Sequence, residues 1–100
     1  MYLSPTEDDR LRIFTAAELA RRALAQGLRL NAPECVALVC DAMHAAARAG
    51  SSYEDVVAAG REAVRSEDVM DGVADIVGEI RLEVLLDEGS RLIVLRDALR

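Results

Sequence analysis

Apolar residues recur at helical spacing through the first two thirds of the chain, then alternate with polar residues towards its end. Apolar positions at i, i+3, i+4 and i+7 indicate amphipathic helices, and segments following Ser4, Asn31 and Ser52 have this pattern. From Ile80 onwards the period changes to two, which is typical of β-strands. The pattern therefore predicts an α+β fold, with three helices, a short extra helical turn and a C-terminal antiparallel β-hairpin.

Residues that favour helix starts stand at the head of each predicted helix. Ser4 lies three residues before Glu7, and Asn31 lies three residues before Glu34. This spacing is that of a capping box, in which the two side chains each accept a hydrogen bond from a backbone N–H near the helix start. Ser52 favours the start of the third helix. The sequence thus predicts three separately capped helices.

Glycines mark the expected helix ends. Gly27 and Gly50 stand where a residue in the left-handed conformation commonly closes a helix. Ser66 favours one more short turn after it, and we expect Gly72 to stop that turn. The pair Asp71 and Gly72 is therefore interpreted first as a helix stop, and second as part of an interface with another chain.

The last twenty residues have the pattern of a hairpin. Apolar positions alternate along 80–86, turn-forming residues occupy 87–90, and a second apolar run covers 91–95. An isolated two-stranded hairpin is marginally stable in water, so one face must pack on the helices. We expect this inner face to carry Leu82, Val84 and Leu86.

The opposite hairpin face is also unusually apolar. We expect it to carry Leu85, Ile93 and Leu95. Two interpretations of that face stay open: contact with a partner chain, or simple packing within the domain. Because the assignment rests on alternation alone, an error of one residue in register would exchange the two faces.

Length and composition limit the core that the chain can build. One hundred residues predict a single domain spanning 1–100. Aromatic residues make up 3% of the chain, so the helices must pack through aliphatic residues, many of them Ala. Because Ala contributes little apolar area, such a domain is a good candidate for completing its core against another chain.

The net charge and the choice of basic residues limit the kinds of partner and chemistry that we expect. The net charge is −6 and the pI is about 4.7, whereas nucleic-acid binding needs clustered positive charge, so we expect no nucleic-acid partner. All twelve basic residues are Arg, which excludes lysine-based Schiff-base chemistry and a carbamylated lysine supplied by this chain. Arg without Lys favours bidentate pairing at interfaces, but a GC-rich genome would give the same composition.

The two cysteines and the N-terminal segment indicate in which cellular compartment the protein is found. Cys35 and Cys40 point in different directions on one helix, so an intrachain disulfide is not expected, and free thiols suit a reducing cytoplasm. The first residues do not have the pattern of a signal peptide, and no apolar run reaches the length of a membrane span. We therefore expect a cytoplasmic protein without a membrane partner.

The chain has few residues for catalysis or metal binding. Cys40 and His44 lie four apart on one helix face, a spacing that could supply two metal ligands, but there is no second His and Cys35 faces elsewhere. The simpler interpretation is a buried thiol beside a partly buried imidazole. Pairs of acids lie near predicted helix starts, where the helix dipole explains them. We expect no catalytic, cofactor-binding or metal-binding residue.

Several separated segments resemble the urease γ subunit family. They are residues 3–7 (LSPTE), 27–38 (GLRLNAPECVAL), 47–50 (ARAG), 60–61 (GR) and 68–73 (DVMDGV). The resemblance extends from Leu3 to about Leu95. Their order and spacing in a chain of this length make the resemblance specific.

The resemblance implies a non-catalytic assembly subunit of a nickel-dependent urease, which hydrolyses urea to ammonia and carbamate. It implies urease α and β subunits as partners, a trimer of αβγ units in the cytoplasm, and nickel held by the α subunit rather than by this chain. Nothing in the residues themselves names that reaction.

The resemblance is weaker in the hairpin. The family usually has Pro-Asp-Gly at the turn, where this chain has Asp87, Glu88 and Gly89, and it usually ends the second strand in a different tail. An alternative interpretation is therefore a γ-like paralogue that acts as a protein-interaction module without a role in urea hydrolysis.

Overall fold

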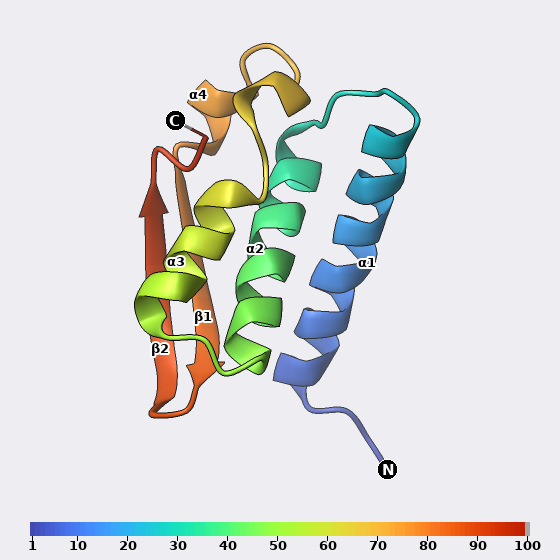
Figure 1. Cartoon of the computed structure of the whole chain (residues 1–100). Helices are drawn as coiled ribbons and strands as arrows, with labels where there is room; N and C mark the ends of the chain where they lie inside the picture. Colours follow the sequence, from blue (N-terminus) through green and yellow to red (C-terminus); the bar gives the residue numbers. More distant parts are fainter. Residues whose placement is uncertain (100) are drawn as a thin grey trace.

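The computed structural model describes residues 1–99, and Figure 1 shows the arrangement of their helices and strands. The elements follow one another as α1 (Pro5–Ala25), α2 (Ala32–Arg48), α3 (Tyr53–Glu62), the 3-10 turn η1 (Ser66–Asp68), α4 (Val73–Val77), β1 (Glu79–Leu86) and β2 (Gly89–Arg96). The predicted α+β fold is confirmed.

Helix α2 forms the centre of the core. It contacts α1, α3, α4 and β1, and in Figure 1 it lies between α1 and α3. Its sequence supplies apolar side chains on more than one face, and these fill the space between the neighbouring elements. The buried residues of α2 are Cys35, Ala37, Leu38, Val39, Cys40, Asp41, Met43 and Ala47.

Helix α1 packs on α2 through smaller side chains than those that α2 buries. It is the longest helix of the described chain, yet its fully buried residues there are Ala17 and Ala20. Small side chains let α1 approach α2 closely, but they bury little apolar area. Leu11, Phe14 and Leu19 stay about half exposed. Ile13 and Leu24 are the larger apolar side chains of α1 that pack against the core, and both are only partly buried.

The predicted helix starts are confirmed. The backbone N–H of Glu7 donates to Ser4 Oγ at 3.1 Å, and the N–H of Ser4 donates to Glu7 Oε1 at 3.0 Å. Asn31 and Glu34 form the same reciprocal pair at 2.9 and 3.0 Å. Ser52 Oγ accepts the N–H of the third helical residue of α3. Each cap satisfies N–H groups that the helix itself leaves unpaired.

Gly27 closes α1 as predicted. It has φ +79°, and its N–H donates to the Leu24 carbonyl at 3.0 Å, while Leu28 N–H donates to the Ala23 carbonyl at 3.0 Å. These two bonds form a Schellman motif, which satisfies carbonyls at the helix end. A residue with a Cβ atom would be strained at this φ, so glycine is favoured there.

The prediction for Gly72 is wrong. Gly72 does not stop a helical turn; it has φ +86° and stands at the start of α4, a helix that the pattern did not predict. The preceding turn η1 begins at Ser66 itself, and the Ser66 side chain does not cap it. The Asp68 carboxylate accepts from Arg65 N–H instead, at 3.2 Å. Five residues are too few to show a helical period.

The hairpin is confirmed, with a tighter turn than expected. Leu86 pairs directly with Gly89, so the turn has two residues, Asp87 and Glu88. Helices α2 and α3 contact the strands on one face, as Figure 1 shows for α3. Val84 and Leu86 are buried on this inner face, and Leu82 is partly buried, as predicted.

The prediction for Ile93 and Leu95 is wrong. Both side chains are fully buried on the inner face, because Ile93 pairs with Leu82 and Leu95 pairs with Ile80. Residues directly opposite each other in an antiparallel pair point to the same face. A turn of even length therefore places odd-numbered β2 residues beside even-numbered β1 residues. Only Leu85 of the three expected outer residues is exposed, at 71%.

No helix formed by residues 1–99 combines the length and the apolar character that crossing a bilayer requires. The longest, α1, carries several charged residues along its length.

Candidate interaction surfaces

A cluster of charged side chains joins α1 to α2. Asp41 is buried on α2, and its two carboxylate oxygens accept from Arg10 Nη1 at 2.7 Å and from Arg21 Nη1 at 2.9 Å. Arg21 also donates to Glu18 at 2.9 Å. We call Arg10, Arg21 and Asp41 the Asp41 cluster. Its charge-assisted hydrogen bonds add to the α1–α2 contact, in which Ala side chains bury little apolar area.

The Asp41 cluster was not predicted from the sequence, although the spacing of Arg10 and Arg21 and the position of Asp41 indicate it. Arg10 and Arg21 are eleven residues apart, which is close to three helical turns, so they share one face of α1. Asp41 interrupts the apolar pattern of α2. A lone acid within a buried helix needs a partner, and two arginines on one face of a neighbouring helix provide it.

The thiols and the imidazole are poorly suited to catalysis. Cys35 and Cys40 are free and buried, and burial raises the pKa of each thiol to about 11. A neutral thiol is a weak nucleophile and a weak metal ligand. Burial lowers the pKa of His44, and the nearby Arg10 lowers it further, whereas Asp41 opposes the shift. The net effect favours the neutral imidazole of His44 over its charged form.

Within residues 1–99, no three His, Cys, Asp or Glu side chains gather where they could hold a metal ion. Nickel is the metal that the family resemblance implies for the enzyme. A dinuclear nickel site needs several imidazoles and a bridging anion, and this chain supplies one His. The residues of this chain do not fit such a site.

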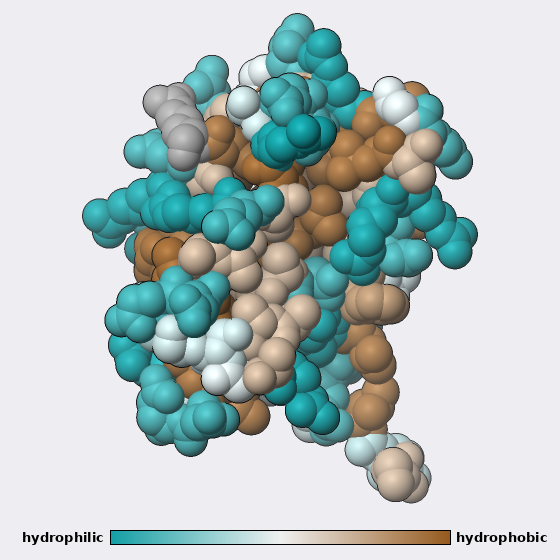
Figure 2. Space-filling view, in the orientation of Figure 1, coloured by the Kyte–Doolittle hydropathy of each residue, from teal (hydrophilic) through white to brown (hydrophobic). Residues whose placement is uncertain are grey.

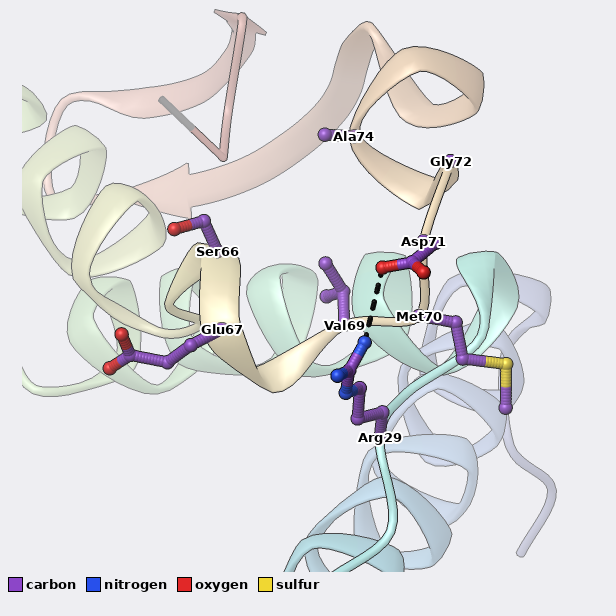
Figure 3. Close-up of a pocket in the computed structure, with 8 residues that line it drawn as sticks. All are labelled: Arg29, Ser66, Glu67, Val69, Met70, Asp71, Gly72 and Ala74. Atoms are coloured by element: carbon purple, nitrogen blue, oxygen red, sulfur yellow. Dashed lines mark hydrogen bonds and ion pairs between the residues drawn. The ribbon is translucent and has the colours of Figure 1, made fainter.

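A hollow of about 350 Å³ lies beside the segment that joins α3 to α4. Figure 3 shows Arg29 and Asp71 pointing toward each other across it, with Arg29 Nη1 3.1 Å from Asp71 Oδ1. Both side chains are exposed. Two backbone hydrogen bonds of 2.8 Å join Leu30 to the segment 68–70 and fix one wall. Asp71 and Gly72 both line this hollow.

A second, larger groove lies beside the turn of the hairpin. It encloses about 550 Å³ between the start of α1, the last turns of α2 and strand β1. Its apolar lining comes from Leu3, Leu11, Ala47, Val84 and Leu85. His44 and several charged residues lie at its margins. The groove continues onto the exposed side of the hairpin, because Leu85 belongs to both.

The exposed side of the hairpin is apolar near the turn and ionic near the other end. Leu85 is 71% exposed and Leu92 is 53% exposed. Glu79 bonds Arg81 at 2.7 Å and Arg96 at 3.3 Å. We call this the hairpin outer face. Alternation along the chain does not place Leu92 on this face, because it assigns Ile93 there instead.

Residues 1–99 thus form a small α+β protein with exposed apolar surfaces and with a buried Asp41 that two arginines of α1 bind. The chain belongs to the urease γ subunit family, since the family model for the gamma subunit of urease matches residues 1–99.

Relatives of known name agree with the family match. A urease subunit gamma from Prochlorococcus marinus is 43% identical over 100 residues and is covered in full, as is this chain. A urease subunit gamma from Saccharopolyspora erythraea is 41% identical over 97 residues, which are 97% of each chain. A urease subunit gamma/beta from Streptomyces avermitilis is 52% identical over 97 residues.

The Streptomyces relatives are longer proteins. The matched residues cover 97% of this chain but 43% of the Streptomyces avermitilis and Streptomyces coelicolor proteins. The present chain therefore corresponds to less than half of those gamma/beta proteins.

Proposed function

We propose that this chain is a non-catalytic γ subunit of a urease and supports its assembly. The observation that carries the proposal is the family match over residues 1–99, together with full-length relatives named urease subunit gamma. In this proposal the enzyme hydrolyses urea to ammonia and carbamate, and the nickel and the catalytic groups lie on an α subunit.

The side-chain chemistry supports a structural role. The protein has one His, whose pKa is lowered, and two buried thiols whose pKa values are raised. Its most buried acid, Asp41, is already bound by two arginines and is committed to joining α1 and α2. Buried thiols with raised pKa values and an acid bound by two arginines are poorly suited to act as a general base.

The proposed partners are urease α and β subunits, in a cytoplasmic trimer of αβγ units. The gamma/beta names of the Streptomyces relatives support a β partner. The hairpin outer face suits a large partner, because Leu85 and Leu92 place apolar surface beside a groove. We assign this face to the α subunit. Buried, free thiols are consistent with a reducing compartment.

Co-expression tests the proposal. The tagged chain is produced with the urease α and β chains of its source organism, purified through the tag and weighed by native mass spectrometry. We expect all three chains in equal amounts. Recovery of the tagged chain without α and without β would contradict the proposal and would favour the interaction-module alternative.

A further inference from the structure

Strand β1 has an outer edge along which no strand of residues 1–99 pairs. The Asp97 N–H donates to the Gly78 carbonyl at 2.9 Å and continues the register of the hairpin. Bonded and unbonded pairs alternate along an antiparallel ladder, so even-numbered residues of β1 bond β2 and odd-numbered ones turn their N–H and carbonyl groups outward. Within residues 1–99, the outward groups of Arg81, Glu83 and Leu85 have no backbone partner.

The two edges of the hairpin have different neighbours. On the β2 edge, Arg96 turns its carbonyl outward, and Arg61 Nη1 of α3 donates to it at 3.1 Å. Strand β1 packs on α2, and α1 lies on the far side of α2 in Figure 1. The β2 edge therefore adjoins α3, whereas the β1 edge faces the side of the molecule on which α1 begins.

The groove of about 550 Å³ lies beside the β1 edge. Glu83, Val84 and Leu85 form one wall, and the start of α1 and the last turns of α2 form the others, with Leu11 and Ala47 among their apolar residues. In Figure 2, hydrophobic residues lie on the surface beside the N-terminal end of α1. Because side chains alternate along a strand, a third strand in this groove would place every second side chain against the apolar wall.

Two charges at the groove have no ion-pair partner within residues 1–99. They are Arg48, the last residue of α2, and Glu83 on β1. Arg10 also lines the groove, but it is bound to Asp41. The two unpaired charges favour a segment that brings a carboxylate to Arg48 and a basic residue beside Glu83, because opposite charges on neighbouring strands attract each other.

We infer that the α chain of the proposed urease adds an extended segment to the outer edge of β1 and so makes the hairpin a three-stranded sheet. The inference rests on the proposed function, which assigns the hairpin outer face to the α chain. Leu85 belongs to both that face and the β1 edge, so one partner covers both. In strand addition the backbone hydrogen bonds supply affinity, and the alternate side chains supply specificity.

Hydrogen exchange of single amides tests this inference in the complex with the α chain of the source organism. Amides exchange in the bound state, the exchange is quenched, and NMR reads the released chain. We expect the outward N–H groups of Glu83 and Leu85 to exchange about tenfold or more slowly in the complex than in the free chain. The N–H of Leu92, which pairs with Glu83 but points out from the β2 edge, is the control and should change by less than about threefold.

Two variants of α1 test the groove separately. Leu11 and Leu19 lie on the same helix and are 49% and 60% exposed, but of the two only Leu11 lines the groove. We expect Leu11→Glu to weaken binding of the α chain by about tenfold or more, and Leu19→Glu to change it by less than about twofold. Calorimetry measures the affinities, and circular dichroism checks that both variants fold.

Two results would overturn the inference while leaving the γ assignment intact. One is an α complex in which the amides of Glu83 and Leu85 exchange as fast as in the free chain. The other is equal affinity of folded Leu11→Glu and Leu19→Glu for the α chain. A wild-type chain that binds no α chain would instead remove the proposed function, and strand addition with it.

Discussion

At the scale of single residues, Asp41 is the most consequential polar side chain of the described chain. Its carboxylate is 10% exposed and accepts from Arg10 and Arg21, both on α1. The Ala-rich seam between α1 and α2 provides little apolar area, so these bonds fix the position of α1. Removing one partner of a buried pair leaves the other charges uncompensated.

Asp41→Asn should lower the free energy of unfolding by about 1–3 kcal/mol. The estimate is below that for a fully buried pair, because the Arg10 and Arg21 side chains are 33% and 39% exposed and can regain water. Denaturant unfolding measures the change. Asp8→Asn, which breaks the exposed Asp8–Arg12 pair, is the control and should cost less than about 0.5 kcal/mol. Equal costs would contradict the role given to Asp41.

His44 should make stability depend on pH. Its pKa is lowered in the folded state, so the unfolded chain binds the proton more readily. The free energy of unfolding should therefore fall as the pH drops below about 6.5, with a slope from this residue of at most ~1.4 kcal/mol per pH unit. His44→Gln should remove this part of the slope. Identical slopes for the two proteins between pH 7 and 5 would contradict the assignment.

For helices and strands, the features that can be predicted from the sequence are those set by residues close together in the chain. The caps at Ser4, Asn31 and Ser52 depend on residues three apart, so they are readable from the chain alone. The inner position of Ile93 depends on the length of the turn, which alternation does not reveal. Helix α4 was missed because it is shorter than two helical turns.

The two faces of β1 should respond differently to charge. Val84 is 1% exposed, so Val84→Glu buries a carboxylate without a partner and should unfold the domain or cost more than about 3 kcal/mol. Leu85 is 71% exposed, so Leu85→Glu should leave the domain folded and weaken its association with the α chain. Circular dichroism and co-purification measure the two effects. An unfolded Leu85→Glu variant would contradict the observed register.

Helix α3 packs closely on the core at Gly60. A Cβ atom at this position would lie 2.8 Å from Met43 Cγ and 2.9 Å from Leu95 Cδ1. Gly60→Ala should therefore cost about 1–3 kcal/mol through overpacking, even though Ala favours helices by about 1 kcal/mol. The denaturant midpoint measures the change. A stabilised variant would mean that α3 can move away from Met43 at little cost.

At the scale of the whole molecule, the sequence identifies a family but not its surfaces. Asp71 and Leu85 were predicted at interfaces from the sequence, and both are exposed; whether partners bind there stays a prediction. Leu92, Met70 and Ile76 could not be assigned, because exposure depends on register and on how α4 packs. The core contains few large side chains, and several apolar side chains remain exposed. Such a domain is suited to assembly with other chains.

Ammonia release from reconstituted mixtures tests whether this chain is a required but non-catalytic subunit of a urease. Purified chain alone, α and β with nickel, and all three chains with nickel are compared under the same conditions, with nickel content measured in each. We expect no ammonia release and no stoichiometric nickel for the chain alone, and full activity only when all three are combined. Turnover or tightly bound nickel in the isolated chain would contradict the account, as would full activity of α and β without it.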